Sequence, residues 1–220
     1  MPFPLIISLT GRSGSGKGTQ VKLLQEYFGN MRCISTGDLF RDLASQNTLV
    51  GKKIKQTIEK GELPFDDIAI ALLLYEIAYK VKDGQGIIFD GVTRHLEEAK
   101  ALDSFLSWLG QKDNVFHLLI DISREEGFHR LTKRRICKKC GRLIPWIGEF
   151  KKLKVCDKCG GELLYRSDDS EKAINSRLDF FDKQVAKVID YYKKQGKLIR
   201  INGEQSIENV FQDILKVFKR

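Results

Sequence analysis

A glycine-rich segment near the start of the chain combines the residue types that bind phosphate groups. Residues 11–17 read GRSGSGK, between an apolar run at residues 5–9 and an amphipathic run at residues 17–28. Glycines at this spacing let backbone N–H groups turn inward around phosphate oxygens, and the start of a helix adds a partial positive charge. Lys17 is then placed to bridge the outer phosphates of a nucleoside triphosphate. The pattern therefore predicts a phosphate-binding loop between a strand and a helix.

The residues after Lys17, and an acidic residue farther along, suggest the same chemistry. A hydroxyl residue usually follows this lysine directly, but here Gly18 follows it and the hydroxyl comes next, at Thr19. Asp90 ends a second apolar run, at residues 86–89. The carboxyl end of a core strand is where phosphate-loop proteins place the carboxylate that orients magnesium. We therefore expect Asp90 to act with magnesium on the bound triphosphate.

Four of the five cysteines form two pairs with the spacing of a metal site. Cys137 and Cys140 are followed, after 15 intervening residues, by Cys156 and Cys159. This spacing, with glycine after each pair, is typical of a four-thiolate zinc site, whereas two disulfides or iron are less favoured alternatives. Four protein ligands leave no open position, so the zinc would be structural and would supply folding free energy. The fifth cysteine, Cys33, is expected to be a buried apolar side chain.

The positive charge of the chain is concentrated in one segment. The net charge is +9, and residues 130–158 contain 11 Lys/Arg and 2 Asp/Glu, so the other 27 basic and 27 acidic residues cancel. A local basic segment fits a concentrated anion such as a triphosphate, or else nucleic acid. Its only large aromatic residues, Trp146 and Phe150, are too few to form a platform on which bases stack. We therefore expect no nucleic-acid partner.

Length and composition indicate one folded domain with small insertions. The 220 residues are 42% hydrophobic, which is enough for a substantial core, and no segment has low-complexity composition. The apolar run at residues 5–9 is too short to span a membrane and lacks the features of a signal peptide. We therefore expect no membrane association and a cytoplasmic location.

Short apolar runs alternate with longer amphipathic ones along most of the chain. The runs typical of strands are at residues 5–9, 32–34, 86–89, 116–120 and 198–201. Helical patterns cover residues 17–28, 66–80, 96–109, 123–134, 171–195 and 207–218. This alternation predicts an α/β fold of three layers around a parallel sheet. Two stretches depart from it, a helical one at residues 36–81 and a turn-rich one at residues 137–165, and we interpret both as insertions.

A series of short motifs, in order along nearly the whole chain, resembles the motifs of adenylate kinases. They are GKGTQ at residues 16–20, ISTGDLFR at 34–41, DGVTR at 90–94, RLTKRR at 130–135, RSDD at 166–169, Arg177, and INGEQ at 201–205. The cysteine pairs resemble those of the subgroup whose lid binds zinc. The resemblance implies reversible transfer of the ATP γ-phosphoryl group to AMP, giving two ADP, with magnesium bound to ATP. It also implies a monomer.

The resemblance implies a division of the chain into three parts. A phosphate-loop core with a five-stranded parallel sheet would comprise residues 1–35, 82–135 and 170–220. Residues 36–81 would form a helical insertion that binds the monophosphate, and residues 136–169 a zinc-ribbon lid over the triphosphate.

The resemblance also assigns roles to individual residues. The ATP-binding residues would be Gly11, Gly14, Ser15, Gly16, Lys17, Gly18, Thr19, Arg130, Arg134, Leu143, Ile144 and Gln205. The AMP-binding residues would be Thr36, Arg41, Leu63, Pro64, Gly91, Arg94, Glu98, Arg166 and Arg177. The residues that act on the transferring group would be Lys17, Asp90, Arg94, Arg130, Arg134, Arg166 and Arg177. Asp168 and Asp169 would orient lid arginines or hold the lid closed. Arginine suits these positions because its guanidinium is permanently charged and donates two parallel hydrogen bonds.

Three residues of the predicted monophosphate site or its loop depart from the adenylate kinase pattern. Val92 and Thr93 replace a Phe-Pro pair that shapes the loop before Arg94. Glu98 replaces a glutamine that reads the base of the monophosphate. An ionised carboxylate only accepts hydrogen bonds, so it matches half of the pairing edge of adenine and matches guanine better. Glu98 is otherwise expected to be protonated, to act through water or to point away.

Three functions therefore remain to be compared. The first is an adenylate kinase, and the second is a kinase of the same family that prefers CMP, UMP or GMP. The third is a phosphate-loop protein whose zinc ribbon and basic segment bind nucleic acid. The third explains the cysteines and the charge, but it leaves the matching arginines unexplained.

Overall fold

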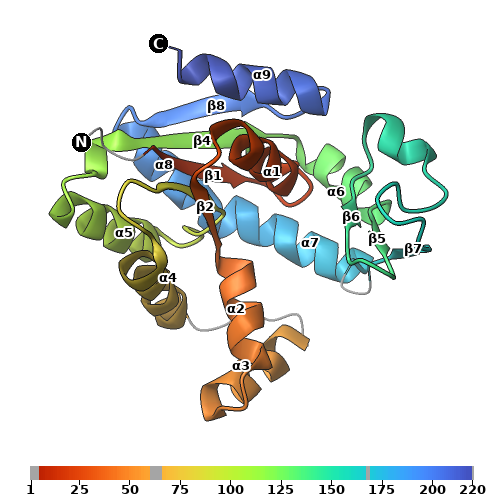
Figure 1. Cartoon of the computed structure of the whole chain (residues 1–220), viewed down its shortest axis with the longest axis horizontal. Coiled ribbons are helices and arrows are strands. Elements are labelled where there is room, and N and C mark those ends of the chain that lie inside the picture. The colour runs from red at the N-terminus through yellow and green to blue at the C-terminus, as the bar shows by residue number, and fades with distance from the viewer. Residues whose placement is uncertain (1–4, 60–65, 167–168, 220) are drawn as a thin grey trace. The chain divides into compact units, whose positions relative to one another are not determined.

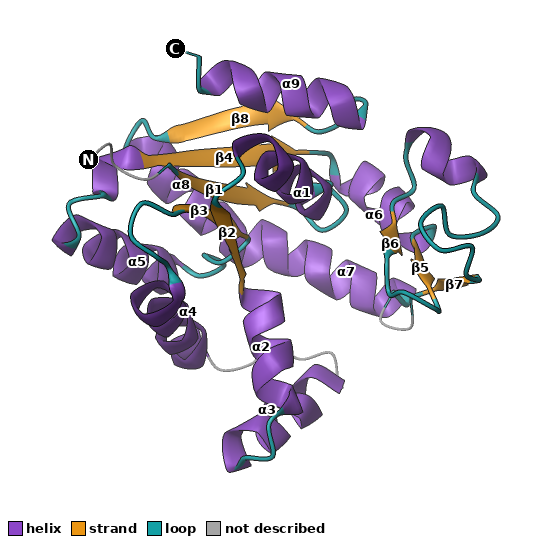
Figure 2. Ribbon diagram, viewed as in Figure 1, coloured by secondary structure: helices purple, strands orange, loops and turns teal. Residues whose placement is uncertain are grey.

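The large sheet of the computed structural model confirms the expected α/β fold. The structure describes residues 5–59, 66–166 and 169–219. Five parallel strands form the sheet, in the order β2-β3-β1-β4-β8 (Figure 2, orange). They are β1 Ile6–Gly11, β2 Met31–Ser35, β3 Gly86–Asp90, β4 Val115–Asp121 and β8 Leu198–Asn202. Each lies at one of the five predicted runs. Ile7 and Ile88 pair across β1 and β3 and are both fully buried, as expected for strands covered on both faces.

Most helices begin and end close to the predicted bounds (Figure 1). The described helices outside the predicted lid are α1 Lys17–Phe28, α2 Thr36–Ser45, α3 Leu49–Glu59, α4 Asp66–Lys80, α5 Leu96–Trp108, α6 Arg124–Thr132, α7 Glu171–Phe180, α8 Ala186–Lys194 and α9 Ile207–Val217. A single 3-10 turn, Lys112–Asn114, precedes β4. Ser123 caps α6 by accepting a hydrogen bond from the Glu126 N–H at 3.3 Å, which explains why this helix begins where the sequence predicts.

The predicted continuous helix at residues 171–195 is wrong in one respect. A π turn, Phe181–Val185, separates α7 from α8. A π turn carries one more residue than a turn of α-helix, so it shifts the faces of the two helices relative to each other. The apolar periodicity of the sequence continues through this point, and the contacts that accompany the π turn come from distant parts of the chain.

The turn-rich stretch at residues 137–165 contains a second, small sheet. Its strands are β5 Arg135–Cys137, β6 Leu143–Ile144 and β7 Leu163–Tyr165, in the order β6-β5-β7. Both pairings are antiparallel, with Arg135 opposite Ile144 in one and opposite Tyr165 in the other. A 3-10 turn, Gly148–Lys152, is the only helical element described in this stretch. The strands have two or three residues, too few for an alternating pattern to predict them.

Contacts between residues divide the chain into two compact units. The first comprises Met1–Thr10, Val21–Leu119 and Lys183–Ile199, and the second comprises Gly11–Gln20, Ile120–Asp182 and Arg200–Arg220. In the first unit, Phe89, Leu73 and Leu102 belong to one apolar core formed with α4 and α5. In the second, Leu131 of α6 packs with Ile174 and Leu178 of α7. This division cuts through strands of the large sheet, so the three-part division based on insertions stays a prediction.

A membrane-spanning helix is not among the described elements. No helix of residues 5–59, 66–166 or 169–219 has the length and apolar character that crossing a bilayer requires.

Candidate functional site

The predicted phosphate loop lies between the end of β1 and the start of α1. Lys17 is the first residue of α1, and its Nζ donates hydrogen bonds to the carbonyl oxygens of Gly11 at 2.6 Å and Arg12 at 3.1 Å. Ser15 is 3% exposed, and its Oγ has no hydrogen-bond partner among the described residues. A buried hydroxyl without a partner is costly, and a phosphate oxygen is the kind of acceptor that would satisfy it. The loop therefore has the chemistry of an anion site.

Glycine is required in this loop for two physical reasons. Gly14 and Gly16 have φ angles of 88° and 90°, which side-chain-bearing residues rarely adopt. A Cβ atom at Gly14 would also lie 2.9 Å from the carbonyl oxygen of Gly127 in α6. In turn, a Cβ at Gly127 would lie 3.1 Å from the carbonyl oxygen of Ser13. Gly127 therefore helps position the loop, a role that sequence reasoning missed because a glycine within a helical pattern gives no sign of its neighbours.

Arg130 reaches the phosphate loop from the last turn of α6. Its Nη1 is 3.5 Å from the carbonyl oxygen of Gly14, and its Nη2 donates to the carbonyl of Gly203 at 3.0 Å. Its Nε donates to Glu126 at 2.6 Å, which is a favourable i,i+4 pair on the helix. The side chain is only 9% exposed, so its charge lies in a partly desolvated place beside the loop. This is where the sequence predicts an arginine that neutralises triphosphate charge.

Two further predicted arginines contact one carboxylate, Asp169, and a third, Arg166, acts electrostatically on one of them. Arg134 donates to both carboxylate oxygens, at 2.8 and 2.9 Å, and Arg177 donates to one of them at 2.5 Å. Burial is the main cause that lowers the pKa of Arg134, and the charge of Asp169 opposes this lowering. The charges of Arg166 and Arg177 add to the lowering, so both guanidinium groups lie near Arg134. These three arginines carry more positive charge than the single Asp169 carboxylate compensates, and such an excess favours binding of a multivalent anion.

The remaining predicted ATP residues lie in different elements of the second unit. Gln205 precedes α9, and its Nε2 donates to the carbonyl of Asn202 at 3.0 Å and to Asp213 at 2.7 Å. Leu143 and Ile144 form β6, with Leu143 42% exposed and Ile144 buried. Their contacts to ATP stay predictions. Asp168 lies outside the described residues, as do Leu63 and Pro64 of the predicted monophosphate site.

Apart from Arg166 and Arg177, the predicted monophosphate residues that the structure describes lie in the first unit. Thr36, the first residue of α2, is buried, and its Oγ1 is 3.4 Å from the carbonyl oxygens of Gly91 and Val92. Arg94 donates from Nε to the same Gly91 carbonyl at 3.1 Å. Gly91 itself follows Asp90, which ends β3 between Leu9 of β1 and Ser35 of β2. The start of α2 and the loop after β3 are thereby brought together.

The charge of Arg41 lies close enough to Arg94 to affect the pKa of Arg94. Burial is the main cause that lowers the pKa of Arg94 below its ordinary value. The charge of Arg41 adds to this lowering, whereas Glu98 and Asp90 oppose it. Arg41 also pairs with Asp38 at 2.5 Å on the exposed surface of α2. Two neighbouring guanidinium groups, one of them partly desolvated, are what a phosphate-binding site requires.

Glu98 is bound to the backbone at the start of α5. Its Oε2 accepts hydrogen bonds from the N–H groups of Arg94 at 2.5 Å and His95 at 3.0 Å, and the residue is 4% exposed. A glutamate three residues after the N-cap is a common partner for the backbone at a helix start. Its carboxylate therefore holds the backbone of Arg94, in a loop that lacks the proline expected there. This role also explains why a carboxylate is tolerated inside the unit.

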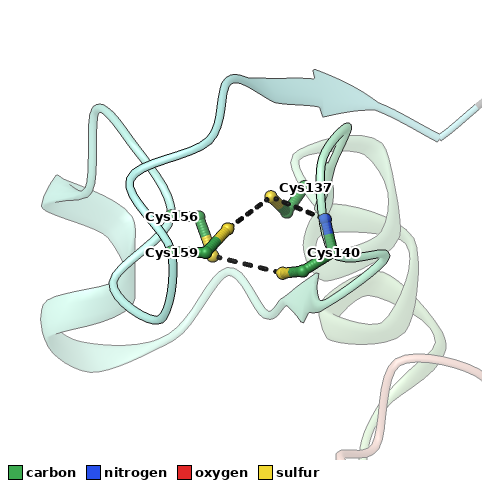
Figure 3. A group of neighbouring side chains, drawn as sticks. All are labelled: Cys137, Cys140, Cys156 and Cys159. Carbon is green, nitrogen blue, oxygen red and sulfur yellow. Dashed lines mark hydrogen bonds between the residues drawn. The ribbon is translucent and has the colours of Figure 1, made fainter.

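The four paired cysteines come together in the second unit (Figure 3). Their sulfur atoms all lie within 4.8 Å of one another, with Cys137 and Cys159 3.5 Å apart and Cys140 and Cys156 3.7 Å apart. These separations exceed a disulfide bond of about 2 Å. They agree with the spacing of about 3.8 Å between thiolates bound to zinc in a tetrahedron. The residues present therefore fit a tetrahedral metal ion.

The backbone around each cysteine pair forms the same tight turn. The Gly141 N–H bonds the Cys137 carbonyl at 2.9 Å, and the Gly160 N–H bonds the Cys156 carbonyl at 2.8 Å. Both glycines have φ near +68°, at 68° and 67°. A Cβ on Gly161 would lie 2.8 Å from the sulfur of Cys137, so a side chain there would displace the sulfur. The glycines noted in the sequence thus shape the cluster.

The electrostatics of the cluster call for a cation. Backbone hydrogen bonding from Cys140 is the main cause that lowers the pKa of Cys137 to about 6. For Cys159, the N–H of Gly161 lowers the pKa, but hydrogen bonding to the neighbouring thiols outweighs this and raises it to about 12. The sulfurs therefore resist carrying four negative charges together unless a divalent cation compensates them.

Cys33 differs from this cluster, and its side chain is half-buried rather than fully buried as the sequence predicts. Burial is the main cause that raises the pKa of its thiol to about 12, and the charges of Asp90 and Asp38 raise it further. A thiol with so high a pKa is a poor nucleophile at neutral pH.

Comparison with known proteins identifies the family. The family model described as adenylate kinase matches residues 9–197. An adenylate kinase of Methanothrix thermoacetophila is 42% identical over 217 residues, which cover 97% of this chain and 98% of that protein. One of Clostridium acetobutylicum is 40% identical, with 96% and 97% covered, and one of Bacillus licheniformis is 39% identical, with 94% of each covered. The phosphate loop, the grouped arginines and these similarities together lead to one conclusion: the chain belongs to the adenylate kinase family.

Proposed function

We propose that this protein transfers the γ-phosphoryl group of magnesium-bound ATP to AMP, reversibly, to give two ADP. The observation that carries this proposal is the phosphate loop, with Lys17 inside it and Arg130 beside Gly14, in a chain of this family. Phosphoryl transfer needs little covalent help from the protein, because its barrier is lowered mainly by positioning and by neutralising charge. Lys17 and Arg130 would supply that charge at the phosphate loop.

The ATP side of the site would consist of the phosphate loop, four arginines and Asp90. The backbone N–H groups of the loop, Ser15 and Lys17 would hold the β- and γ-phosphates, and Arg130 would neutralise charge beside them. Arg134, Arg166 and Arg177 would act on the transferring group. When ATP binds, phosphate oxygens would replace the Asp169 carboxylate as the hydrogen-bond partner of these arginines. Magnesium would be carried on the phosphates and oriented by Asp90, and it would compensate the charge of the phosphate oxygens.

The AMP side would consist of the residues around Arg41 and Arg94, together with Arg166 and Arg177. Arg41 and Arg94 would bind the phosphate of AMP, with Thr36 and Gly91 beside the nucleoside. Leu63 and Pro64 would line the base. Glu98 would serve this site through the backbone of Arg94, because that is the group its carboxylate contacts.

We further propose that the cysteine cluster binds one structural zinc ion. The support is that the four sulfurs have the spacing of a tetrahedral zinc site. Four thiolates fill such a site and leave no position open for substrate, so the ion would be structural. Residues 136–169 would then form a lid whose fold depends on zinc. The protein is proposed to act as a cytoplasmic monomer, which sedimentation at assay concentration would test.

An acceptor panel tests the proposed reaction. Purified protein is incubated with magnesium-ATP and either AMP, dAMP, GMP, CMP or UMP, and the nucleoside diphosphate products are separated and quantified. We expect ADP formation with AMP to exceed transfer to GMP, CMP and UMP by at least about 100-fold in kcat/KM, a difference that one or two lost hydrogen bonds can produce.

The same panel tests the second candidate, a kinase with another base preference. The observation that favours it is the carboxylate at Glu98, which offers no donor to adenine. A higher kcat/KM with CMP, UMP or GMP than with AMP would contradict AMP as the acceptor and would retain the fold and the transfer chemistry. No transfer to any acceptor would contradict both candidates.

A further inference from the structure

Arg12 lies in the phosphate loop, but its side chain contacts groups outside the loop. Its Nε donates to the carbonyl of Ile122 at 3.3 Å, and its guanidinium carbon lies 4.4 Å from the ring centroid of Phe181. Its Nη1 pairs with the carboxylate of Asp182. The side chain is 14% exposed. The Phe181 ring thus covers the face of this guanidinium, and the Ile122 carbonyl and Asp182 accept from its N–H groups. The guanidinium is therefore held by the protein and does not extend into solvent.

The partner of Arg12 is itself held by a second arginine. Arg124, the first residue of α6, donates from Nη1 to Asp182 at 2.9 Å. Its Nη2 contacts Asp179 at 2.7 Å and Asn175 at 3.2 Å. Burial on its own would raise the pKa of Asp182, but the hydrogen bonds from Arg12 and Arg124 outweigh it and hold the pKa below its usual value. Asp182 therefore stays ionised and links the loop to α6.

The contacts of Arg12 converge on the π turn that follows α7. Phe181 and Asp182 are the first two residues of this turn. Consecutive residues of an ordinary α-helix point about 100° apart, whereas a π turn changes the local spacing and often lies at a functional site. The ring of Phe181 and the carboxylate of Asp182 both reach the same guanidinium. The π turn, which the sequence pattern did not predict, therefore coincides with the anchor of the loop.

The loop is also held from α6, close to Arg12. A Cβ on Gly127 would lie 3.4 Å from Cδ of Arg12 and 3.1 Å from the carbonyl oxygen of Ser13. Residues 12–14 are thus confined between α6 and the end of α7, and the same loop carries the buried Ser15 hydroxyl and the Arg12 carbonyl that accepts from Lys17 Nζ. The backbone N–H groups of such a loop bind phosphate well only when their directions are fixed beforehand.

We propose that Arg12 and Asp182 form a positioning pair that holds the phosphate loop in its ATP-binding conformation. The pair acts through the loop backbone and touches neither nucleotide. This inference rests on the proposed function, in that the loop is taken to bind ATP. It predicts an effect on ATP alone, because both residues and all their partners lie in the second unit.

The test compares Arg12→Ala and Asp182→Asn with the matched control Asp179→Asn. Asp179 contacts Arg124 as Asp182 does, but only Asp182 pairs with Arg12. We measure KM for ATP and for AMP, and the Kd of magnesium-ATP by calorimetric titration without AMP. Arg12→Ala and Asp182→Asn should each raise both ATP constants about tenfold, the size expected when one charge-assisted hydrogen bond is lost. KM for AMP should stay within about twofold, as should every constant of the control.

The double variant Arg12→Ala/Asp182→Asn should weaken ATP binding no more than either single change. The reason is that each of the three variants removes the same ion pair between Arg12 and Asp182. An unchanged Kd for ATP in both single variants would overturn the proposal, and so would an equal rise in KM for AMP. If Asp182→Asn fails to fold, Arg12→Ala and Arg12→Lys carry the comparison. Wild-type protein that binds ATP but transfers to no monophosphate would contradict the proposed function, while the titration would still test this pair.

Discussion

At the scale of single residues, Glu98 shows how a side chain predicted from a motif acquires a different role in the structure. The sequence places it where a glutamine reads the base, and the structure places its carboxylate on the N–H groups of Arg94 and His95. The backbone conformation before α5 decides this, and no pattern in residues 90–98 reveals it. By contrast, Lys17 and Ser15 were predictable because the loop motif defines its own local geometry.

Replacing Glu98 with glutamine tests which role dominates. Glutamine keeps an oxygen that accepts the backbone hydrogen bonds but removes the charge beside Arg94, so we expect a loss of about 1 kcal/mol in the free energy of unfolding. The ratio of kcat/KM for AMP to that for CMP should change less than about twofold, because the carboxylate is engaged with the backbone. Glu98→Ala should raise KM for all monophosphates together. A change of about tenfold in the ratio would mean that residue 98 reads the base after all.

His117 predicts how stability depends on pH. Its ring is 3% exposed on β4, stacks on Tyr192 with ring centroids 3.7 Å apart, and has an Nδ1 without a hydrogen-bond partner among the described residues. Burial, with a smaller contribution from the charge of Lys197, lowers its pKa from 6.5 to about 4. Between these values the unfolded chain binds more protons than the folded one, so stability must fall as the pH is lowered from about 6.5 toward 4.

The size of this effect is measurable with a matched variant. Between pH 7 and pH 5, protonation of His117 in the unfolded chain should lower the free energy of unfolding by about 2 kcal/mol. Denaturant unfolding of His117→Phe should show a pH dependence weaker by that amount, since phenylalanine can stack on Tyr192 without titrating. His129→Asn, at a largely exposed position, should retain the full dependence. Equal slopes for wild type and His117→Phe would mean that His117 is already protonated or solvated in the fold.

At the scale of elements, agreement with the sequence depends on how local the cause is. α1 and α4 begin and end at the predicted residues, and each is followed by a turn with a positive-φ glycine, Gly29 after α1 and Gly84 after α4. The sequence pattern did not predict the π turn at Phe181–Val185 or the strands β5, β6 and β7. The first accompanies contacts with Arg12 and Arg124, and the others are held together by a cluster of cysteines rather than by their own sequence pattern.

The small sheet has little core of its own. Of the described residues in 136–169, the buried ones are Cys137, Ile144 and Cys156, two of which are expected metal ligands. Aromatic and charged contacts add to the segment, such as Trp146 beside Arg135 at 5.5 Å, but such half-buried contacts contribute only about 1–2 kcal/mol each. Structural zinc sites provide apparent binding free energies of about 10–16 kcal/mol in small peptides. We infer that this segment depends on its metal ion for folding.

Removal of the metal ligands tests this dependence. In Cys156→Ser/Cys159→Ser, bound zinc measured by elemental analysis should fall from one ion per chain to nearly none. Hydrogen exchange should then become fast for backbone amides in residues 136–165, while amides of β1 and β3 keep their protection. Cys33→Ser should retain both the zinc and the protection, because Cys33 lies outside the cluster. Retained protection without zinc would show that the segment folds on its own packing.

At the scale of the whole molecule, the alternation of strands and helices was sufficient to predict an α/β fold around a parallel sheet, and each of the five strands lies at a predicted apolar run. That prediction works because parallel strands connected by helices have few alternative arrangements. The grouping of distant residues was predictable only through resemblance to a family. Arg134, Arg166 and Arg177 are ordinary helix or loop charges in the sequence, and the fold brings Arg134 and Arg177 to Asp169, with Arg166 near Arg134. Arg12 and Gly127 lacked even that signal, since no motif singles them out.

The most direct test of the account is a phosphorus NMR measurement of ATP, AMP and ADP with purified protein and with Lys17→Ala prepared identically. The wild type should convert equal amounts of ATP and AMP into ADP in the presence of magnesium, and should form ATP and AMP from ADP alone. Lys17→Ala should be slower by at least about 100-fold, because one preorganised charge at the phosphates contributes several kcal/mol, yet it should melt near the wild-type temperature. Equal conversion by both proteins, or none by a folded, zinc-loaded wild type, would contradict phosphoryl transfer at this site.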